Sequence, residues 1–357
     1  MKVGLIVNFR AGRGPTHNLP LITTLLPQLL SGLRIIMPVT AVLVSEETVA
    51  TAITREIGLP VVPLPVTSRG NRNETITAAR LACQMGAEVL VVVGGDGTLA
   101  DAALGILLAQ KVLPVGGLAA KTRLLGVGIG TTNVGPLVAF KGEELLGATV
   151  VQLEQWLRAL QPFNPPALVA EVADEILGVG FNDCTFGFTV PATVDGQRWD
   201  VDATALLAGR HERGSVGPIG GPNTEVWLRR SKHELLVGKG HKIGQIIIGT
   251  VDGRYIGKAV SGGVCLAALA GAPAALVLAD KPLTRINIDA SKLEAIEPVT
   301  SQCFSLFTGD KVTVKGLVNN TVICVDGNPL SQLSVEKKVT VIVDTALVTC
   351  LRPVNKH

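Results

Sequence analysis

The sequence predicts an α/β protein with an N-terminal doubly wound parallel-sheet domain followed by a mostly antiparallel β domain. The first 140 residues alternate strand-like and helix-like runs, which is typical of a parallel sheet with helices on its faces. From residue 167 onward, period-two runs are separated by Asp-Gly, Gly-Asp and Asn-Asn turns, which indicates antiparallel strands. The composition agrees, because a chain that is 47% hydrophobic and only 3% aromatic, with 40 glycines, lets helices lie close to a sheet.

In the first domain, strand-like runs begin near residues 2, 40, 59, 88 and 123. The intervening helical runs comprise a proline-interrupted stretch to about residue 31 and stretches over residues 46–58, 73–86 and 99–110. For the third of these, Asn73 is the expected N-cap and Gly86 the expected C-cap. The motif GGDGT is expected to be a loop after a buried strand, with Thr98 starting the next helix.

A domain boundary is expected at the proline-rich stretch LQPFNPP. The first domain then covers residues 1–163 and the second covers residues 164–357, with the final residues able to pack back on the first domain. Strand-like runs of the second domain lie over residues 168–183, 224–238, 244–253, 285–290, 303–316, 320–327 and 337–351. The cleft between the two domains is the expected site.

Charge and composition exclude several classes of protein. A net charge of +3, from 32 basic and 29 acidic residues, is too balanced for a nucleic-acid-binding protein. The N-terminus lacks a signal-peptide pattern, and the six widely spaced cysteines are expected to be reduced and buried, so we expect a cytoplasmic protein. Residues 260–279 form an uncharged run of 20, but its glycines and proline favour a buried helix followed by a buried strand over a membrane span.

The motif GGDGT, Gly94 to Thr98, formally fits a dinucleotide fingerprint through Gly95, Gly97 and Ala100. The carboxylate of Asp96 would oppose a pyrophosphate there, and no acidic residue follows about 20 positions later to bind a ribose. The better interpretation places phosphates on the glycine amides and the helix start, with Asp96 accepting the proton of an attacking hydroxyl. A plain Asp-Gly turn is the alternative, and it is the favoured interpretation at Asp195, Asp252 and Asp326.

Two further glycine-rich loops, NFRAGRG after the first strand and GIGTTNVG from residue 128, are expected at the same edge of the sheet. Ligands of such sheets bind beyond the carboxyl ends of the strands. Each loop alone could be a tight turn that needs positive φ. Three loops at one edge favour a binding site.

The motif GGDGT after a buried strand, in an α/β domain followed by a β domain, resembles the superfamily of NAD kinases, diacylglycerol and sphingosine kinases and 6-phosphofructokinases. VGFND (residues 179–183) is similar to the Asn-Glu/Asp motif of NAD kinases. LLGVGIGTTNVGPL and VGLIVNFRAGRG resemble other glycine-bearing segments of the superfamily. The length, GTTNVGP and GKAVSGGVCLAAL look closest to the acetoin catabolism protein X branch.

The resemblance implies a role for each matching residue. Asp96 would deprotonate the acceptor hydroxyl, which is the ribose 2′-OH if NAD is the acceptor. The residues implied in nucleotide and phosphate binding are Asn8, Gly12, Gly14, Gly94, Gly95, Gly97, Thr98, Gly130, Thr131 and Asn133. Those implied in acceptor binding are Asn182, Asp183, Asp252, Ser261 and Gly262. The segment AVSGGV departs from the Thr-Pro-Thr-Gly-Ser-like segment of NAD kinases, which leaves the acceptor open.

No histidine spacing indicates a structural metal site. Mg²⁺ is expected to arrive with ATP; Asp101 could ligate it or could be an acid at a helix start. The predicted function is phosphoryl transfer from ATP or polyphosphate to a hydroxyl of a nucleotide-like acceptor, most simply NAD, linked through the resemblance to acetoin catabolism. The alternatives are a non-catalytic nucleotide-binding accessory protein of acetoin catabolism and a diacylglycerol-type lipid kinase. The expected partners are small nucleotides and further copies of the chain, without nucleic acid or membrane.

Overall fold

The computed structural model describes residues 1–12, 14–45, 49, 51, 56–66, 71–112, 122–130, 133, 135–194, 197–251, 261–281 and 299–354. Most of the predicted helix 46–58 and the whole of the predicted strand 285–290 lie outside these residues. The chain divides into two compact units. Unit 1 is Met1–Pro165 together with the segment that starts at Ala346, and unit 2 is Pro166–Thr345.

Unit 1 contains a doubly wound sheet with strand order β3-β2-β1-β4-β5-β22-β7, in which β6 also pairs with β5. The strands are β1 (Lys2–Val7), β2 (Ala41–Val44), β3 (Val61–Pro63), β4 (Ala87–Gly94), β5 (Arg123–Gly128), β6 (Val138–Lys141), β7 (Leu160–Phe163) and β22 (Thr349–Pro353). The described pairs are parallel except for β22 with β7. The chain runs from β1 outward to β3, returns to β4 beside β1, and continues in the other direction. The switch point of the sheet therefore lies between β1 and β4.

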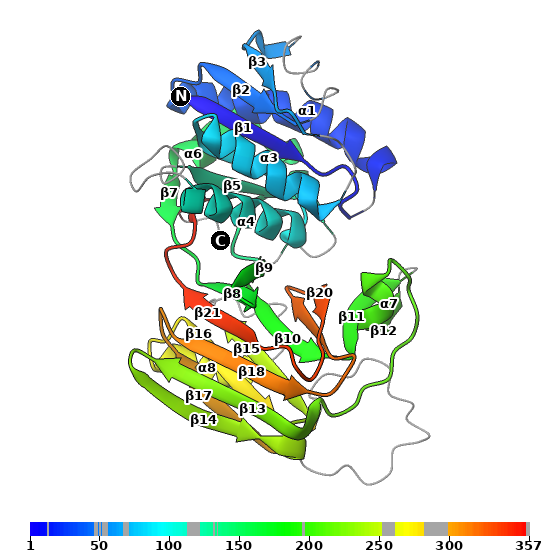
Figure 1. The fold of residues 1–357 in the computed structure, drawn as a ribbon. Coiled ribbons are helices and arrows are strands. Elements are labelled where there is room, and N and C mark those ends of the chain that lie inside the picture. Colours follow the sequence, from blue (N-terminus) through cyan, green and yellow to red (C-terminus); the bar gives the residue numbers. More distant parts are fainter. Residues whose placement is uncertain are drawn as a thin grey trace. The chain divides into compact units, whose positions relative to one another are not determined.

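Helices cover both faces of this sheet, with α1 on one face and α3 and α4 on the other (Figure 1). The helices of unit 1 are α1 (Pro15–Ile36), α3 (Arg72–Gln84), α4 (Asp96–Val112), α5 (Gly142–Gly147) and α6 (Val150–Arg158). On the α3 face, a Cβ added to Gly4 of β1 would lie 3.1 Å from the Cβ of Ala82. This close packing of small residues fits the composition of the chain.

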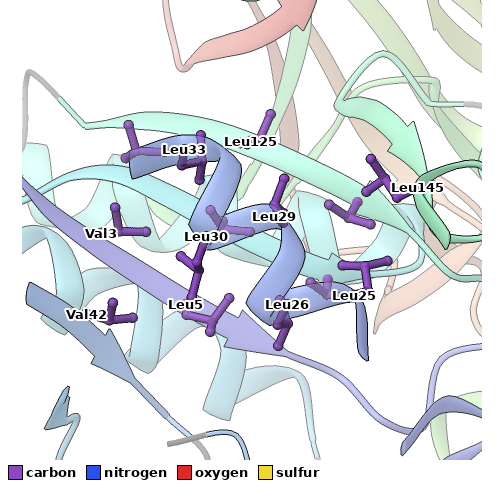
Figure 2. Close-up of a cluster of buried hydrophobic side chains, with 14 of the residues drawn as sticks. Val3, Leu5, Leu25, Leu26, Leu29, Leu30, Leu33, Val42, Leu125 and Leu145 are labelled. Atoms are coloured by element: carbon purple, nitrogen blue, oxygen red, sulfur yellow. The ribbon is translucent and has the colours of Figure 1, made fainter. Parts of the chain in front are cut away.

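Helix α1 is one helix that continues to Ile36 and contains both Pro20 and Pro27, where the sequence predicts an interrupted run ending near residue 31. Its length and apolar composition would allow it to cross a membrane, a criterion that core helices of globular proteins also meet. Its leucines pack on β1, β2 and β5 in the core of unit 1 (Figure 2). The buried leucines are Leu25, Leu26, Leu29, Leu30 and Leu33.

Two helices begin at residues other than those predicted. Helix α3 is capped by Asn71, whose side chain accepts the N–H of Glu74 at 3.2 Å, and not by Asn73. Helix α4 begins at Asp96 rather than at Thr98. Its first hydrogen bond in the described backbone runs from the N–H of Leu99 to the carbonyl of Gly95, so the GGDGT motif is mostly helix and only briefly loop.

Unit 2 contains two antiparallel six-stranded sheets, as predicted for the second domain, with strand orders β14-β13-β18-β21-β8-β9 and β17-β16-β15-β10-β19-β20. Apolar side chains from both sheets form one core, for example Val226 and Val314 from the first and Phe186 and Ile248 from the second. The strands of the first sheet are β8 (Ala167–Val172), β9 (Glu175–Gly180), β13 (Gly220–Arg230), β14 (His233–Lys239), β18 (Lys311–Leu317) and β21 (Val339–Asp344). Those of the second are β10 (Asp183–Gly187), β15 (Gln245–Thr250), β16 (Ala274–Ala279), β17 (Ser301–Leu306), β19 (Val322–Val325) and β20 (Asn328–Gln332).

The remaining elements of unit 2 lie beside these sheets. They are the hairpin β11 (Thr189–Val194) and β12 (Gln197–Asp202), with α7 (Ala203–Leu207), η2 (Gly240–Lys242) and α8 (Ser261–Leu269). Helix α8 followed by the buried strand β16 confirms the predicted order of a helix and a buried strand within residues 260–279. The prediction that the helix is buried is wrong, because Leu266 and Leu269 of α8 are 62% and 86% exposed.

Four of the six cysteines are buried. Burial raises the pKa of the Cys83 thiol to about 11 and the pKa of the Cys324 and Cys350 thiols to about 12. Cys265 and Cys303 are exposed, so the prediction that the cysteines are buried is wrong for these two. Cys265 lies among apolar residues in the sequence, but some of these residues lie on the outer face of α8.

Candidate functional site

Three backbone loops meet at the carboxyl edge of the unit 1 sheet. A Cβ added to Gly12, in the loop after β1, would lie 2.5 Å from the carbonyl oxygen of Ile129, in the loop after β5. A Cβ added to Gly130 would lie 2.8 Å from the Cα of Gly95, in the loop after β4. The loops therefore touch through their backbones, and any side chain at Gly12 or Gly130 would force them apart.

The side chain of Asn8 connects the loop after β1 to the first turn of α4. Its Nδ2 donates to Oγ1 of the buried Thr98 at 2.8 Å, while its backbone N–H donates to the carbonyl of Val93 at 2.9 Å. A Cβ added to Gly94 would lie 2.6 Å from the Cβ of Thr98. Gly94 thus allows Thr98 to occupy the position from which it meets Asn8.

Asp96 is the first residue of α4 and is half-buried at the switch point of the sheet. Its Oδ1 accepts the backbone N–H of Gly135, from the loop after β5, at 3.0 Å. A carboxylate at a helix N-terminus is favoured by the helix dipole. The N–H groups of the first helical turn, which here includes Gly97 and Thr98, have no acceptor within the helix and form an anion-binding end.

The loop after β5 is closed on itself by Asn133, which has φ of 49°. Its Oδ1 accepts the N–H of Gly130 at 2.8 Å and its Nδ2 donates to the carbonyl of Gly130 at 2.7 Å. Asn133 therefore shapes the backbone that faces Gly95. The neighbouring Thr131, predicted to bind phosphate, lies outside the described residues.

Sequence reasoning missed Asn18, which holds the loop after β1 from within α1. It is 1% exposed, and its Nδ2 donates to the carbonyls of Phe9 and Ala11 at 2.9 and 2.5 Å. Gly14, with φ of 84°, precedes α1, and its carbonyl accepts the N–H of Asn18. The signal in the sequence that could have identified Asn18 is an amide side chain on the buried side of an otherwise leucine-rich helix.

Asp101 joins α3 to α4 through an ion pair with Arg72, in which Nε lies 2.8 Å from Oδ1. Burial raises the pKa of the Asp101 carboxyl, and Arg72 opposes that rise. This pairing favours a structural role over the Mg²⁺-binding role considered for Asp101. Within the described residues, no group of three His, Cys, Asp or Glu side chains is arranged to hold a metal ion.

In unit 2, Asn182 and Asp183 lie in the turn between β9 and β10 and are organised by Asp326, in the turn between β19 and β20. One carboxylate oxygen of Asp326 accepts the N–H of Phe181 at 2.8 Å. The other accepts the N–H groups of Asn182 and Asp183 at 2.7 and 3.0 Å. Asp326 and Gly327 form the predicted turn, with φ of 48° and 76°. The Asp326 side chain adds a structural role that the sequence did not indicate, because it binds the backbone of a second turn.

The first turn of α8 lies near the same segment. A Cβ added to Gly249 would lie 3.0 Å from Cγ2 of Val264 in α8 and 4.0 Å from the carbonyl oxygen of Asn182. Ser261 and Gly262 are the first residues of α8, but their side chains, like all of Asp252, lie outside the described structure. The residues predicted to bind phosphate thus gather in unit 1, and the described residues predicted to bind the acceptor gather in unit 2.

Comparison with known proteins gives limited guidance. The chain matches no protein-family model. It is 26% identical, over 362 residues and the full length of both chains, to an uncharacterized protein of Archaeoglobus fulgidus.

Among solved structures, the chain is similar to yeast NADH kinase complexed with NADH, with a TM-score of 0.49 and 14% identity over all of this chain and 84% of the other. It is also similar to a protein of Bacillus anthracis named as a diacylglycerol kinase, in two structures with TM-scores of 0.45 and 0.46 and 12% identity. These two alignments cover 98% of this chain and 96% and 98% of the others. Similarity at this level does not carry a substrate or a reaction over to this chain.

Proposed function

We propose that this protein transfers a phosphoryl group from ATP or polyphosphate to a hydroxyl of a nucleotide-like acceptor, with NAD as the acceptor. The observation that carries the proposal is the position of Asp96. It begins α4 at the switch point of the unit 1 sheet, half-buried, between glycine backbones that leave no side chain in the way. Phosphoryl transfer requires positioned phosphates and an oriented hydroxyl more than covalent help from the protein.

In this proposal, the amides of Gly95 and Gly97 and the N-terminus of α4 bind the donor phosphates. Asp96 accepts the proton of the acceptor hydroxyl as its oxygen attacks the terminal phosphorus and the shortened donor leaves. Gly95 supports this assignment, because among the described residues a Cβ there would meet only the Cα of Gly130, at an ordinary contact distance of 3.5 Å. The packing of the described residues therefore gives Gly95 no steric reason to lack a side chain, whereas the close approach of a phosphate does.

We further propose that Asn182 and Asp183 bind the acceptor through its hydroxyl and amino groups. Asn182 is buried and Asp183 is half-buried beside it, in the turn whose backbone Asp326 holds. The cytoplasmic location, the homo-oligomeric state and the link to acetoin catabolism belong to the same proposal and rest on the sequence alone.

The test is an assay of purified protein with Mg²⁺, ATP or polyphosphate, and NAD or NADH, in which a cycling enzyme detects NADP(H). We expect product from the wild type and a loss of about 10²-fold or more for Asp96→Asn, the scale of a general base. Glu143→Gln is the matched control, because Glu143 is an exposed acid in the first turn of α5 in the same unit. It should keep wild-type activity.

Two outcomes would contradict the proposal. Equal activity of wild type and Asp96→Asn would remove Asp96 from the role of base. If no product formed while calorimetry detected ATP or NAD binding, the chain would be a nucleotide-binding protein without transfer to this acceptor. Phosphorylation of diacylglycerol in vesicles, run in parallel, would instead identify a lipid kinase.

A further inference from the structure

The turn that carries Asn182 and Asp183 is held from two sides by side chains distant in the sequence. The Asp326 carboxylate accepts three consecutive N–H groups, those of residues 181–183, at 2.7–3.0 Å. From β15, Oγ1 of the buried Thr250 donates to the carbonyls of Phe181 and Asn182 at 2.6 and 3.2 Å. Both the donors and the acceptors of this short backbone segment therefore have fixed partners.

The position of the Asp326 carboxylate is itself fixed by its turn. Val325 pairs with Asn328 across β19 and β20, so Asp326 and Gly327 are the two central residues of a tight hairpin. Positive φ at both residues is the pattern of a type I′ turn, which aspartate followed by glycine adopts readily. Gly180 completes the fit, because a Cβ there would lie 2.4 Å from Cγ1 of Val325 and 3.1 Å from Oδ1 of Asp326.

Consecutive backbone N–H groups that converge on one point form a binding site for an anion. In this turn the anion is already supplied by the chain, so the N–H groups of residues 181–183 are engaged by Asp326 and do not bind a ligand phosphate. The polar side-chain groups of the turn are the carboxylate of Asp183 and the amide of Asn182. The carboxylate suits hydroxyl and amino donors and repels phosphate, and the amide can both accept and donate hydrogen bonds.

We propose that Asp326 is a positioning residue that presents Asn182 and Asp183 to the acceptor and, by occupying the anion site of their backbone, restricts the turn to the uncharged, donor-bearing part of the ligand. This inference rests on the proposed function for the identity of the acceptor. The placement of the turn by Asp326 does not depend on it.

The decisive variant is Asp326→Asn, because asparagine tolerates the same positive φ but removes the negative charge and replaces one of the two acceptor oxygens with an NH2 group. We expect KM for NAD to rise about tenfold or more, the effect of weakened charge-assisted hydrogen bonds. KM for ATP and kcat should stay within about twofold, because the interaction lost is one of binding. Asp174→Asn is the matched control, since Asp174 is an exposed aspartate with φ of 66° in the β8–β9 turn of the same unit.

A second measurement separates this inference from the proposed function. Without any ligand, amide hydrogen exchange of residues 181–183 should be faster in Asp326→Asn than in the wild type and unchanged in Asp174→Asn. In Asp326→Gly, which keeps the turn but removes the carboxylate, added formate or inorganic phosphate should slow this exchange, and it should have no such effect in the wild type.

Unchanged exchange in Asp326→Asn, or an equal rise of KM for ATP and NAD, would overturn the positioning role. Formate or phosphate that leaves exchange in Asp326→Gly unaffected would overturn the anion site. If the exchange results hold but no variant or wild type forms NADP, the proposed acceptor is wrong and the positioning of the turn by Asp326 stands.

Discussion

Gly94 and Gly95 are neighbours whose lack of a side chain has different causes. A Cβ on Gly94 would come within 2.6 Å of the Cβ of Thr98, whereas a Cβ on Gly95 would have its nearest contact at 3.5 Å. Gly94 must be a glycine because the first turn of α4 packs against the backbone that precedes it. No described residue of the chain requires glycine at position 95, whereas a ligand that approaches this backbone would require it.

This difference predicts opposite behaviour for two substitutions. Gly94→Ala should lower the free energy of unfolding by about 1–3 kcal/mol, because Thr98 must move. Gly95→Ala should change it by no more than about 0.5 kcal/mol. It should nevertheless weaken ATP binding about tenfold or more, which corresponds to about 1.4 kcal/mol. Urea unfolding and calorimetry measure the two quantities. Full ATP affinity in Gly95→Ala would show that the phosphates do not lie on this residue.

At the same scale, the sequence allowed the glycine loops and Asp96 to be placed because each follows a buried strand directly, so local order decides their position. Asp326 and Asn18 could not be assigned in the same way. Their roles come from hydrogen bonds to the backbone of other elements, which depend on how β19 lies beside β10 and how α1 begins beside its loop. Residue type and spacing in the sequence do not predict such contacts.

At the scale of elements, helices α3 and α4 approach each other closely at Gly105. A Cβ added there would lie 2.5 Å from the carbonyl oxygen of Ile76 and 2.6 Å from the Cβ of Ala79, both in α3. The ion pair of Arg72 with Asp101 joins the same two helices nearer their N-termini. Helix α4 is therefore fixed against α3 at Asp101 and Gly105, within three turns of its first residue, Asp96.

Helix propensity and packing make opposite predictions for Gly105→Ala. Propensity alone would stabilise α4 by about 1 kcal/mol. We expect packing to decide, with a net loss of about 1–3 kcal/mol in the free energy of unfolding, because the carbonyl of Ile76 belongs to a helical backbone that cannot turn away. Gly147→Ala is the control, since no atom lies within 4 Å of a Cβ at that position. Stabilisation by Gly105→Ala in urea unfolding would contradict this account of the contact.

The alternation of strands and helices predicted most elements of unit 1, but the proline positions misled the interpretation of α1. Pro20 and Pro27 lie inside one helix because the surrounding leucines pack on the sheet, and this packing outweighs the local cost of proline. The starts of α3 and α4 were each displaced by two residues. The start of a helix depends on which residue has the backbone geometry of a cap. Several neighbouring residues of this sequence could have served as the cap, so the sequence did not determine the start.

At the scale of the whole molecule, the last described strand belongs to the same sheet as the first. Strand β22 lies between β5, to which it is parallel, and β7, to which it is antiparallel. It is separated in the sequence from both by all of unit 2. No local pattern could predict this neighbour order, although the buried residues Cys350 and Leu351 mark the segment as an interior strand.

This topology predicts that unit 1 needs the end of the chain and that unit 2 does not. A chain that ends after Thr345 loses β22 and the buried side chains of Leu347, Val348, Cys350 and Leu351. Each fully buried aliphatic side chain contributes about 1.5–3 kcal/mol, so the loss is comparable with the stability of a whole domain, about 5–15 kcal/mol.

The core of unit 2, by contrast, is built only from residues between 168 and 343. Amide hydrogen exchange of the shortened chain should therefore show loss of protection in β1, β4 and β5, with protection retained in β15, β16 and β18. A chain that ends after Val354 keeps β22 and serves as the control. If β4 and β5 stayed protected in the chain that ends at Thr345, β22 would be an accessory edge. The switch point that holds Asp96 would then be complete without it.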